Sequence, residues 1–303
     1  MPFDAAHDQS HCRMRAPMHV LLHPGIQLLS GPQRLALYEN TLAQLKDELR
    51  RATRRPTAVY FSPSSDLFQP VPAVLATAHD VLELLLGEGV GVSILTKGVI
   101  PQQTMALLEQ HSGLVRIQVG VITIDEAIAA QFEPDVPTPG TRIEQMRQLA
   151  AAGVPVEARL DPILPGITDS SDGLRQLFDC AASAGVTMAA AGVLFLRPAI
   201  VSALRRAVPA SVLSPLFGAY GTRDRVGLRG GSPALIDAPS RTVRADILGR
   251  VREAAAASGI TVRTCACKNP DLASGTCNIA GTSPPRPPTV TPRQPELPNI
   301  SRA

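Results

Sequence analysis

Three cysteines stand within 13 residues near the end of the chain, although the whole sequence holds only five. Cys265, Cys267 and Cys277 form a Cys-x-Cys-x9-Cys pattern, with Pro270 and Gly275 favouring turns between them. Three thiolates at such spacing can bind a zinc ion or an iron–sulfur cluster. The alternative is three free thiols at the frayed end of a domain. The density of the cluster favours the metal site.

Polar side chains also follow short apolar segments, where strands are expected to end. Ser64, Ser65 and Asp66 follow the first of these segments, and Lys97 follows the second. Hydroxyls and a carboxylate suit a ribose or an amino-acid ammonium group, whereas a lysine suits a carboxylate or a phosphate. The alternatives are a helix cap for the first group and a solvated strand end for Lys97.

Two further strand ends carry charged or turn-forming residues. Glu133 and Arg142 are expected to form an ion pair that orders a loop. Residues 161–166, which are rich in proline, lead from a predicted strand into a loop. Gly166 there allows either a close approach of the backbone to a ligand or a plain tight turn.

The elements that must position these residues alternate along the middle of the chain. Apolar segments predict strands at Ala58–Ser62, Val92–Leu95, Val115–Val121, Val154–Leu160 and Val186–Phe195. Helical spacing predicts helices at Gln33–Ala52, Ala73–Leu86, Gln102–Gln110, Arg142–Ala152 and Asp172–Ala184. This alternation predicts right-handed βαβ units in a parallel sheet covered on both faces. Five strands in series are too few for a closed eight-stranded barrel.

The regular pattern ends after Pro198. A segment rich in Arg and Gly is followed by a helix at Arg244–Ser258 and a short strand at Ile260–Arg263. We predict an N-terminal segment at 1–32, a partial α/β barrel at 33–200, a cysteine-bearing C-terminal extension at 201–280, and a disordered Pro-rich tail at 281–303.

Composition excludes several classes of protein. There is no run of 18 apolar residues for a membrane span, and no apolar core of a secretory signal, so a cytoplasmic protein is expected. A net charge of +3, 3% aromatic residues and no tryptophan do not suit a dedicated nucleic-acid binder. Five cysteines in such a chain point to metal or thiol chemistry instead of disulfides.

Taken in order, the polar strand ends resemble a known family. The segments that carry the likeness are Phe61–Asp66 with Phe68–Pro70, Ser93–Lys97, Ile122–Glu126 with Phe132–Pro134, and Asp161–Gly166. Together they resemble radical S-adenosyl-L-methionine proteins of the spore photoproduct lyase-like (DNA repair photolyase-like) group, over roughly residues 35–200. The resemblance implies a partial TIM barrel of the (β/α)6 type. It also implies a [4Fe–4S] cluster and S-adenosyl-L-methionine at the carboxyl ends of the strands.

The resemblance also implies roles for individual residues. Ser64, Ser65 and Asp66 would contact the methionine or ribose part of S-adenosyl-L-methionine, and Lys97 its carboxylate or ribose side. Reductive cleavage of that cofactor would start radical chemistry of a lyase type on an unknown small-molecule or nucleic-acid substrate. The electron would come from a donor such as flavodoxin or ferredoxin. Cys265, Cys267 and Cys277 would hold an auxiliary iron–sulfur cluster or zinc.

The chain departs from the family pattern near its beginning. The family's Cys-x3-Cys-x2-Cys loop belongs shortly before Ala16–His19, where only Cys12 is nearby; His7, His11 and Met14 stand at the three cysteine positions. The first barrel strand is missing as well, and Gly120 stands where a hydroxyl residue is often found. Either the chain starts too late, or it is a degenerate member without the radical cluster.

Two other functions remain open. The first is a scaffold or binding protein that kept the barrel without a cluster. The second is an ordinary α/β-barrel lyase, with Lys97 as a Schiff-base amine and Asp66 or Asp161 moving the proton. In addition, a sheet without its first strand is expected to expose an edge at Ala58–Ser62 or its neighbour.

Overall fold

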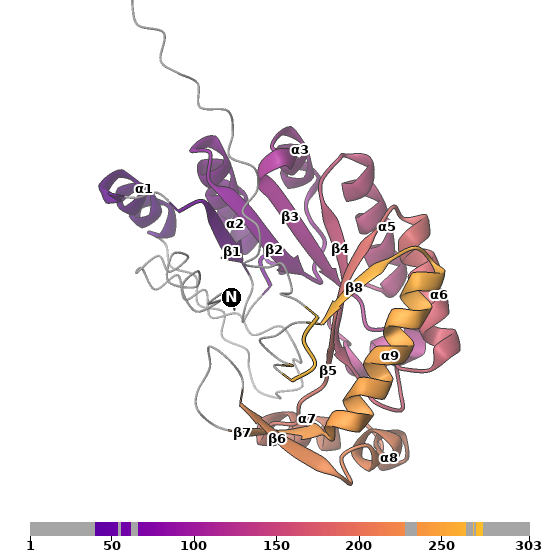
Figure 1. The fold of residues 1–303 in the computed structure, drawn as a ribbon. Coiled ribbons are helices and arrows are strands. Elements are labelled where there is room, and N and C mark those ends of the chain that lie inside the picture. Colours follow the sequence, from indigo (N-terminus) through magenta and orange to yellow (C-terminus); the bar gives the residue numbers. More distant parts are fainter. Residues whose placement is uncertain are drawn as a thin grey trace, which may run out of the picture.

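The predicted α/β fold is confirmed: six parallel strands form one curved sheet, with helices along its outer side (Figure 1). The computed structural model describes residues 40–53, 56–61, 66–227, 235–264, 269 and 271–274. The strand order is β1-β2-β3-β4-β5-β8. These strands are β1 (Ala58–Phe61), β2 (Gly91–Thr96), β3 (Val115–Gly120), β4 (Val156–Ile163), β5 (Met188–Val193) and β8 (Thr261–Thr264).

Helices connect successive strands, and a short hairpin precedes the last helix. The helices are α1 (Thr41–Arg51), α2 (Pro72–Gly87), α3 (Gln102–Gln110), α4 (Glu126–Phe132), α5 (Pro139–Ala151), α6 (Ser171–Ser183), α7 (Pro198–Ala207), α8 (Ala210–Gly218) and α9 (Arg241–Ala257). The hairpin pairs β6 (Arg223–Gly227) with β7 (Leu235–Pro239) in antiparallel fashion. No described helix is long and apolar enough to cross a membrane.

The two faces of the sheet differ because side chains alternate along each strand. On β3, Val115, Ile117 and Val119 join the main hydrophobic core beneath the helices. The alternate positions, Arg116 and Gln118, lie on the concave face instead. Within the described residues, helices therefore cover one face and the concave face carries polar side chains, in place of the cover on both faces that the apolar strands predicted.

A second apolar cluster lies beyond the carboxyl ends of β3, β4 and β5. Ile122, Leu164 and Leu194, which follow these strands, pack there with residues of α4, α7 and α8. The buried hydroxyl of Tyr220 donates a hydrogen bond of 2.5 Å to the carbonyl of Leu194. Burial raises the pKa of this hydroxyl. The cluster anchors α7 and α8 to this end of the sheet.

The two ends of the sheet come from distant parts of the chain. In the described part, β1 pairs with β2 alone and so forms one edge, as expected for this strand. At the other edge β8 pairs with β5, so part of residues 201–280 belongs to the same sheet. The expected helix at 33–52 is described from Thr41, and the division of the chain at residues 32, 200 and 280 stays a prediction.

Candidate functional site

Lys97 directly follows β2, at the carboxyl edge of the sheet, and Asp66 holds the backbone around it. One carboxylate oxygen of Asp66 accepts hydrogen bonds from the Thr96 hydroxyl (2.6 Å) and the Phe68 amide (3.0 Å). The other oxygen accepts from the amides of Lys97 (2.6 Å) and Gly98 (3.3 Å). With two donors on each oxygen, the acceptor capacity of this carboxylate is used within the protein. Asp66 therefore positions Lys97.

Gln145 of α5 fixes the same segment from its other side. Its buried amide accepts a hydrogen bond from the Ile100 amide (2.8 Å) and donates one to the Gly98 carbonyl (3.1 Å). The backbone of Gly98 also lies close to Phe68, because a Cβ on Gly98 would stand 2.2 Å from the Phe68 carbonyl oxygen. The chain from Thr96 to Ile100 is thus held by both the β1–α2 loop and α5.

The side chain of Lys97 ends in a buried ion-pair network. Its ammonium donates to Glu133 Oε1 at 2.5 Å, and Arg142 Nη1 donates to Glu133 Oε2 at 2.7 Å. The side chains of Glu133 and Arg142 are only 7% and 1% exposed. Burial acts to raise the pKa of the Glu133 carboxyl, but Lys97 and Arg142 outweigh it and hold that pKa below its ordinary value.

Gly120, the last residue of β3, makes room for this network. A Cβ built on Gly120 would stand 2.7 Å from Lys97 Cγ and 2.9 Å from Cε, so the lysine stem crosses directly over the glycine. The Gly120 carbonyl accepts a second bond from Arg142 Nη1 at 2.9 Å. Among the described residues, Nε and Nη2 of Arg142 have no hydrogen-bond partner, although both are buried.

The Lys97 ammonium remains available to a further acceptor. Within the described residues Glu133 is its one hydrogen-bond and ion-pair partner, which leaves two of its three N–H donors. Lys97 and Glu133 border a cavity of about 30 Å³ with apolar walls that include Ile122 and Leu194. This space holds about one water molecule. The donor set suits a carboxylate or another oxyanion at Lys97.

A second polar chain runs along the concave face. Arg159 donates to Asp161 Oδ2 at 2.6 Å and to Gln118 Oε1 at 3.0 Å, and Gln118 donates to Glu157 Oε2 at 2.9 Å. Asp161 lies against Gly192 of β5, where a Cβ would stand 3.2 Å from Oδ1. Small residues on β5 thus accommodate the charged side chains of β4.

The structure brings together some of the residues that were predicted from the sequence. Asp66 lies against Lys97, and the Glu133–Arg142 ion pair is confirmed. Gly166 lies in a tight turn, since its φ is +73° and the Ile167 amide donates to the Leu164 carbonyl at 3.0 Å.

Other predicted residues lie outside the described part of the chain. These are Ser64, Ser65, Cys265, Cys267, Cys277, His7, His11, Cys12 and Met14, as well as the predicted tail at 281–303. Among the described residues, no three His, Cys, Asp or Glu side chains are grouped to hold a metal ion. The metal site therefore stays a prediction.

Sequence comparison finds relatives without an assigned activity. No protein-family model matches the chain. An uncharacterized protein of Mycobacterium tuberculosis is 31% identical over 150 residues, which are 49% of this chain and 44% of that protein. An uncharacterized protein of Acidianus two-tailed virus is 32% identical over 95 residues, or 31% of this chain and 32% of its own length. The chain thus spans less than half the length of these relatives.

Structural comparison is more informative about the fold. A variant of spore photoproduct lyase with bound AdoMet and dinucleoside spore photoproduct superposes with a TM-score of 0.57 and 14% identity, covering 73% of this chain and 64% of that one. Another variant of spore photoproduct lyase superposes with a TM-score of 0.55 and 15% identity, covering 74% of this chain and 65% of that one. The chain has a radical-SAM-like fold. At this identity the likeness is one of fold, and the chain spans less than two thirds of these neighbours.

Proposed function

We propose that this chain binds S-adenosyl-L-methionine at the carboxyl end of its sheet and serves radical chemistry on a substrate still to be identified. The observation that carries the proposal is Lys97, which is held at the end of β2 by Asp66 and Gln145 and keeps two N–H donors. The radical-SAM-like fold supports it, since spore photoproduct lyase was solved with AdoMet bound.

Several residues of this chain would contribute to the binding of S-adenosyl-L-methionine. Lys97 would bind the carboxylate of the methionine part, while Glu133 fixes the position of the ammonium. Ser64 and Ser65 would contact the methionine or ribose part, and Asp66 would act through the backbone it holds. S-adenosyl-L-methionine bound beside a reduced [4Fe–4S] cluster supplies the radical chemistry. Cys265, Cys267 and Cys277 would hold an auxiliary cluster or zinc.

Cluster content and cofactor cleavage test the proposal together. The full chain is reconstituted anaerobically with iron and sulfide, then reduced with dithionite in the presence of S-adenosyl-L-methionine. We expect bound iron and acid-labile sulfide, together with methionine and 5′-deoxyadenosine, the products of one-electron cleavage followed by uptake of a hydrogen atom. A flavodoxin or ferredoxin would replace dithionite in the cell.

A variant with all three C-terminal cysteines changed to alanine separates the two clusters. Cluster signal that survives in this variant places iron elsewhere in the chain and supports radical chemistry. Iron lost completely, with no 5′-deoxyadenosine from either protein, contradicts the proposal and favours a cluster-less binding protein of the same fold.

The geometry does not favour the Schiff-base lyase. Lys97 is one half of an ion pair with Glu133, an arrangement that suits binding an anion more than attack on a carbonyl. The two carboxylates considered as proton carriers are also engaged, Asp66 by four protein donors and Asp161 by Arg159.

A further inference from the structure

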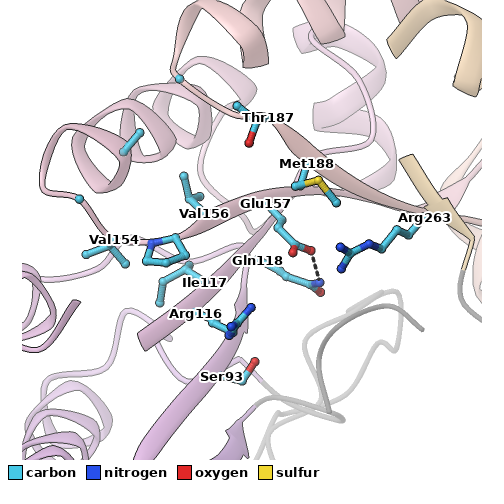
Figure 2. Close-up of a pocket in the computed structure, with 14 residues that line it drawn as sticks. Ser93, Arg116, Ile117, Gln118, Val154, Val156, Glu157, Thr187, Met188 and Arg263 are labelled. Carbon is cyan, nitrogen blue, oxygen red and sulfur yellow. Dashed lines mark hydrogen bonds between the residues drawn. The ribbon is translucent and has the colours of Figure 1, made fainter. Parts of the chain in front are cut away.

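Charged side chains line a cavity of about 400 Å³ at the amino ends of β3, β4 and β5 (Figure 2). These side chains are engaged within the chain. Glu157 accepts a hydrogen bond from Gln118 at 2.9 Å. Arg116 and Arg263 also have interaction partners within the protein. A charge without a counter-charge lies instead at the other end of the sheet, where Lys97 follows β2.

The network of Lys97, Glu133 and Arg142 carries one positive charge in excess. Its two cations share one carboxylate, because Lys97 Nζ lies 2.5 Å from Glu133 Oε1 and Arg142 Nη1 lies 2.7 Å from Oε2. Within the described residues, neither cation has another ion-pair partner. The side chains of Lys97, Glu133 and Arg142 are only 18%, 7% and 1% exposed, so water and salt screen the excess charge weakly.

The same network holds hydrogen-bond donors that lack acceptors. Lys97 keeps two of its three N–H donors. Nε and Nη2 of Arg142 are buried, and among the described residues they have no hydrogen-bond partner. Charged donors that are left unsatisfied inside a protein are costly. An anion beside the Lys97 ammonium would balance the charge of the network and accept hydrogen bonds from the lysine.

The space beside Lys97 limits the size of such an anion. The cavity that Lys97 and Glu133 border has a volume of about 30 Å³ and room for about one water molecule. Chloride is hardly larger than a water molecule, whereas phosphate and sulfate are much larger. The remaining walls are apolar, as at Ile122 and Leu194, so they offer no competing hydrogen bonds. Glu133 repels an anion, but Lys97 and Arg142 together outweigh its single charge.

We propose that Lys97 binds a chloride ion in this cavity when S-adenosyl-L-methionine is absent, and that the carboxylate of the methionine part displaces it. The displacement rests on the proposed function, whereas the excess charge and the cavity are properties of the chain itself. Chloride therefore competes with S-adenosyl-L-methionine, and the apparent affinity for the cofactor falls as the chloride concentration rises. Sulfate, which is too large for the cavity, does not compete in this way.

Chloride binding is measured without a cofactor or a cluster by the width of the ³⁵Cl NMR signal, which broadens when a protein holds the ion. The full chain is compared with Lys97→Gln and with Lys46→Gln, which removes the same charge from an exposed position of α1 and is the matched control. We expect the wild type and the control to broaden the signal equally, and Lys97→Gln to lose most of the broadening. Equal broadening by all three proteins overturns the proposal. If Lys97→Gln fails to fold, wild-type crystals soaked in bromide decide, since an anomalous diffraction peak is expected beside Lys97 Nζ and its absence overturns the proposal.

Titration with S-adenosyl-L-methionine then tests the displacement. We expect the broadening that depends on Lys97 to disappear as the cofactor binds. In equilibrium dialysis, the apparent dissociation constant of the cofactor is expected to rise linearly with chloride concentration and to stay unchanged in sulfate of matched ionic strength. Cofactor binding that leaves the chloride signal unchanged overturns the displacement. Broadening that depends on Lys97, in a chain that binds no S-adenosyl-L-methionine, supports the chloride site and contradicts the proposed function.

Discussion

Lys97 crosses directly over Gly120, and a Cβ at position 120 would stand 2.7 Å from Lys97 Cγ. The contact is with the middle of the lysine stem, so the side chain cannot avoid it by moving its end alone. Lys97 reaches Glu133, 36 residues away in sequence, because residue 120 has no side chain. Gly120 first stood out as a departure from the family pattern, and the structure gives that departure a physical reason.

Gly120→Ala is expected to lower the free energy of unfolding by about 1–3 kcal/mol, the usual cost of overpacking a filled site. Urea unfolding measures the change. Gly87→Ala is the matched control, because no atom lies within 4 Å of a Cβ built there at the end of α2. The control is expected to be neutral or slightly stabilising. Equal effects at the two glycines would contradict the crossing of Lys97 over Gly120.

Glu133→Gln is expected to lower the free energy of unfolding by about 3 kcal/mol. The change removes the one carboxylate between Lys97 and Arg142 and leaves the buried guanidinium without its counter-charge. Glu144→Gln, in an exposed ion pair with Arg147, is expected to change stability by less than about 0.5 kcal/mol. Chemical unfolding of both variants checks the difference. A loss no larger at Glu133 than at Glu144 would show that the network contributes little.

The carboxyl group of Glu133 also makes the stability of the protein depend on pH. The pKa of Glu133 in the folded protein lies below its ordinary value of 4.5, since Lys97 and Arg142 outweigh the effect of burial. The unfolded chain therefore takes up the proton first as the pH falls. The stabilisation from Glu133 is complete above pH 4.5 and is lost as the pH falls through the folded pKa.

Unfolding of the wild type and of Glu133→Gln, followed from pH 6 downward, measures this contribution. The gap between their unfolding free energies is expected to be constant above the ordinary pKa and to shrink below it. A gap that stays constant to pH 3 would show that the folded pKa of Glu133 is not the source of the stabilisation.

Asp66→Asn distinguishes positioning from direct contact with a cofactor. The amide replaces one acceptor oxygen by a donor, which would face N–H or O–H groups of Lys97, Gly98 or Thr96. We expect the free energy of unfolding to fall by about 1–3 kcal/mol with no cofactor added. Asp80→Asn, exposed on α2, is the control. An Asp66 variant of wild-type stability that binds S-adenosyl-L-methionine poorly would instead show direct contact.

The sheet was predictable from the sequence because its strands are apolar and evenly spaced. The first five strands lie within two or three residues of the predicted ranges, as with β5 at Met188–Val193 against the predicted Val186–Phe195. Local patterns missed α4, although a signal was present. Asp125 caps that helix, and its carboxylate accepts hydrogen bonds from the amides of Ala127 and Ile128. The hairpin of β6 and β7 was also missed, in a segment dominated by Arg and Gly.

The contacts of the candidate site were harder to predict, because they join residues far apart in sequence. The Glu133–Arg142 pair spans nine positions and could be foreseen, whereas the Lys97–Glu133 pair could not. Gln145 carried no local signal either, since its role depends on where α5 lies relative to β2. A polar residue on the buried face of a helix is the one feature that could have drawn attention to it.

The proposed function is tested most directly by the binding of S-adenosyl-L-methionine to the full chain, measured by equilibrium dialysis for the wild type and for Lys97→Gln. Lys46→Gln, at an exposed lysine of α1, is the matched control. We expect saturable binding by the wild type and by the control, and a loss of about tenfold in affinity in Lys97→Gln, since a charged hydrogen bond is removed. Absence of binding by the wild type, or equal affinity in all three proteins, would contradict the proposed function.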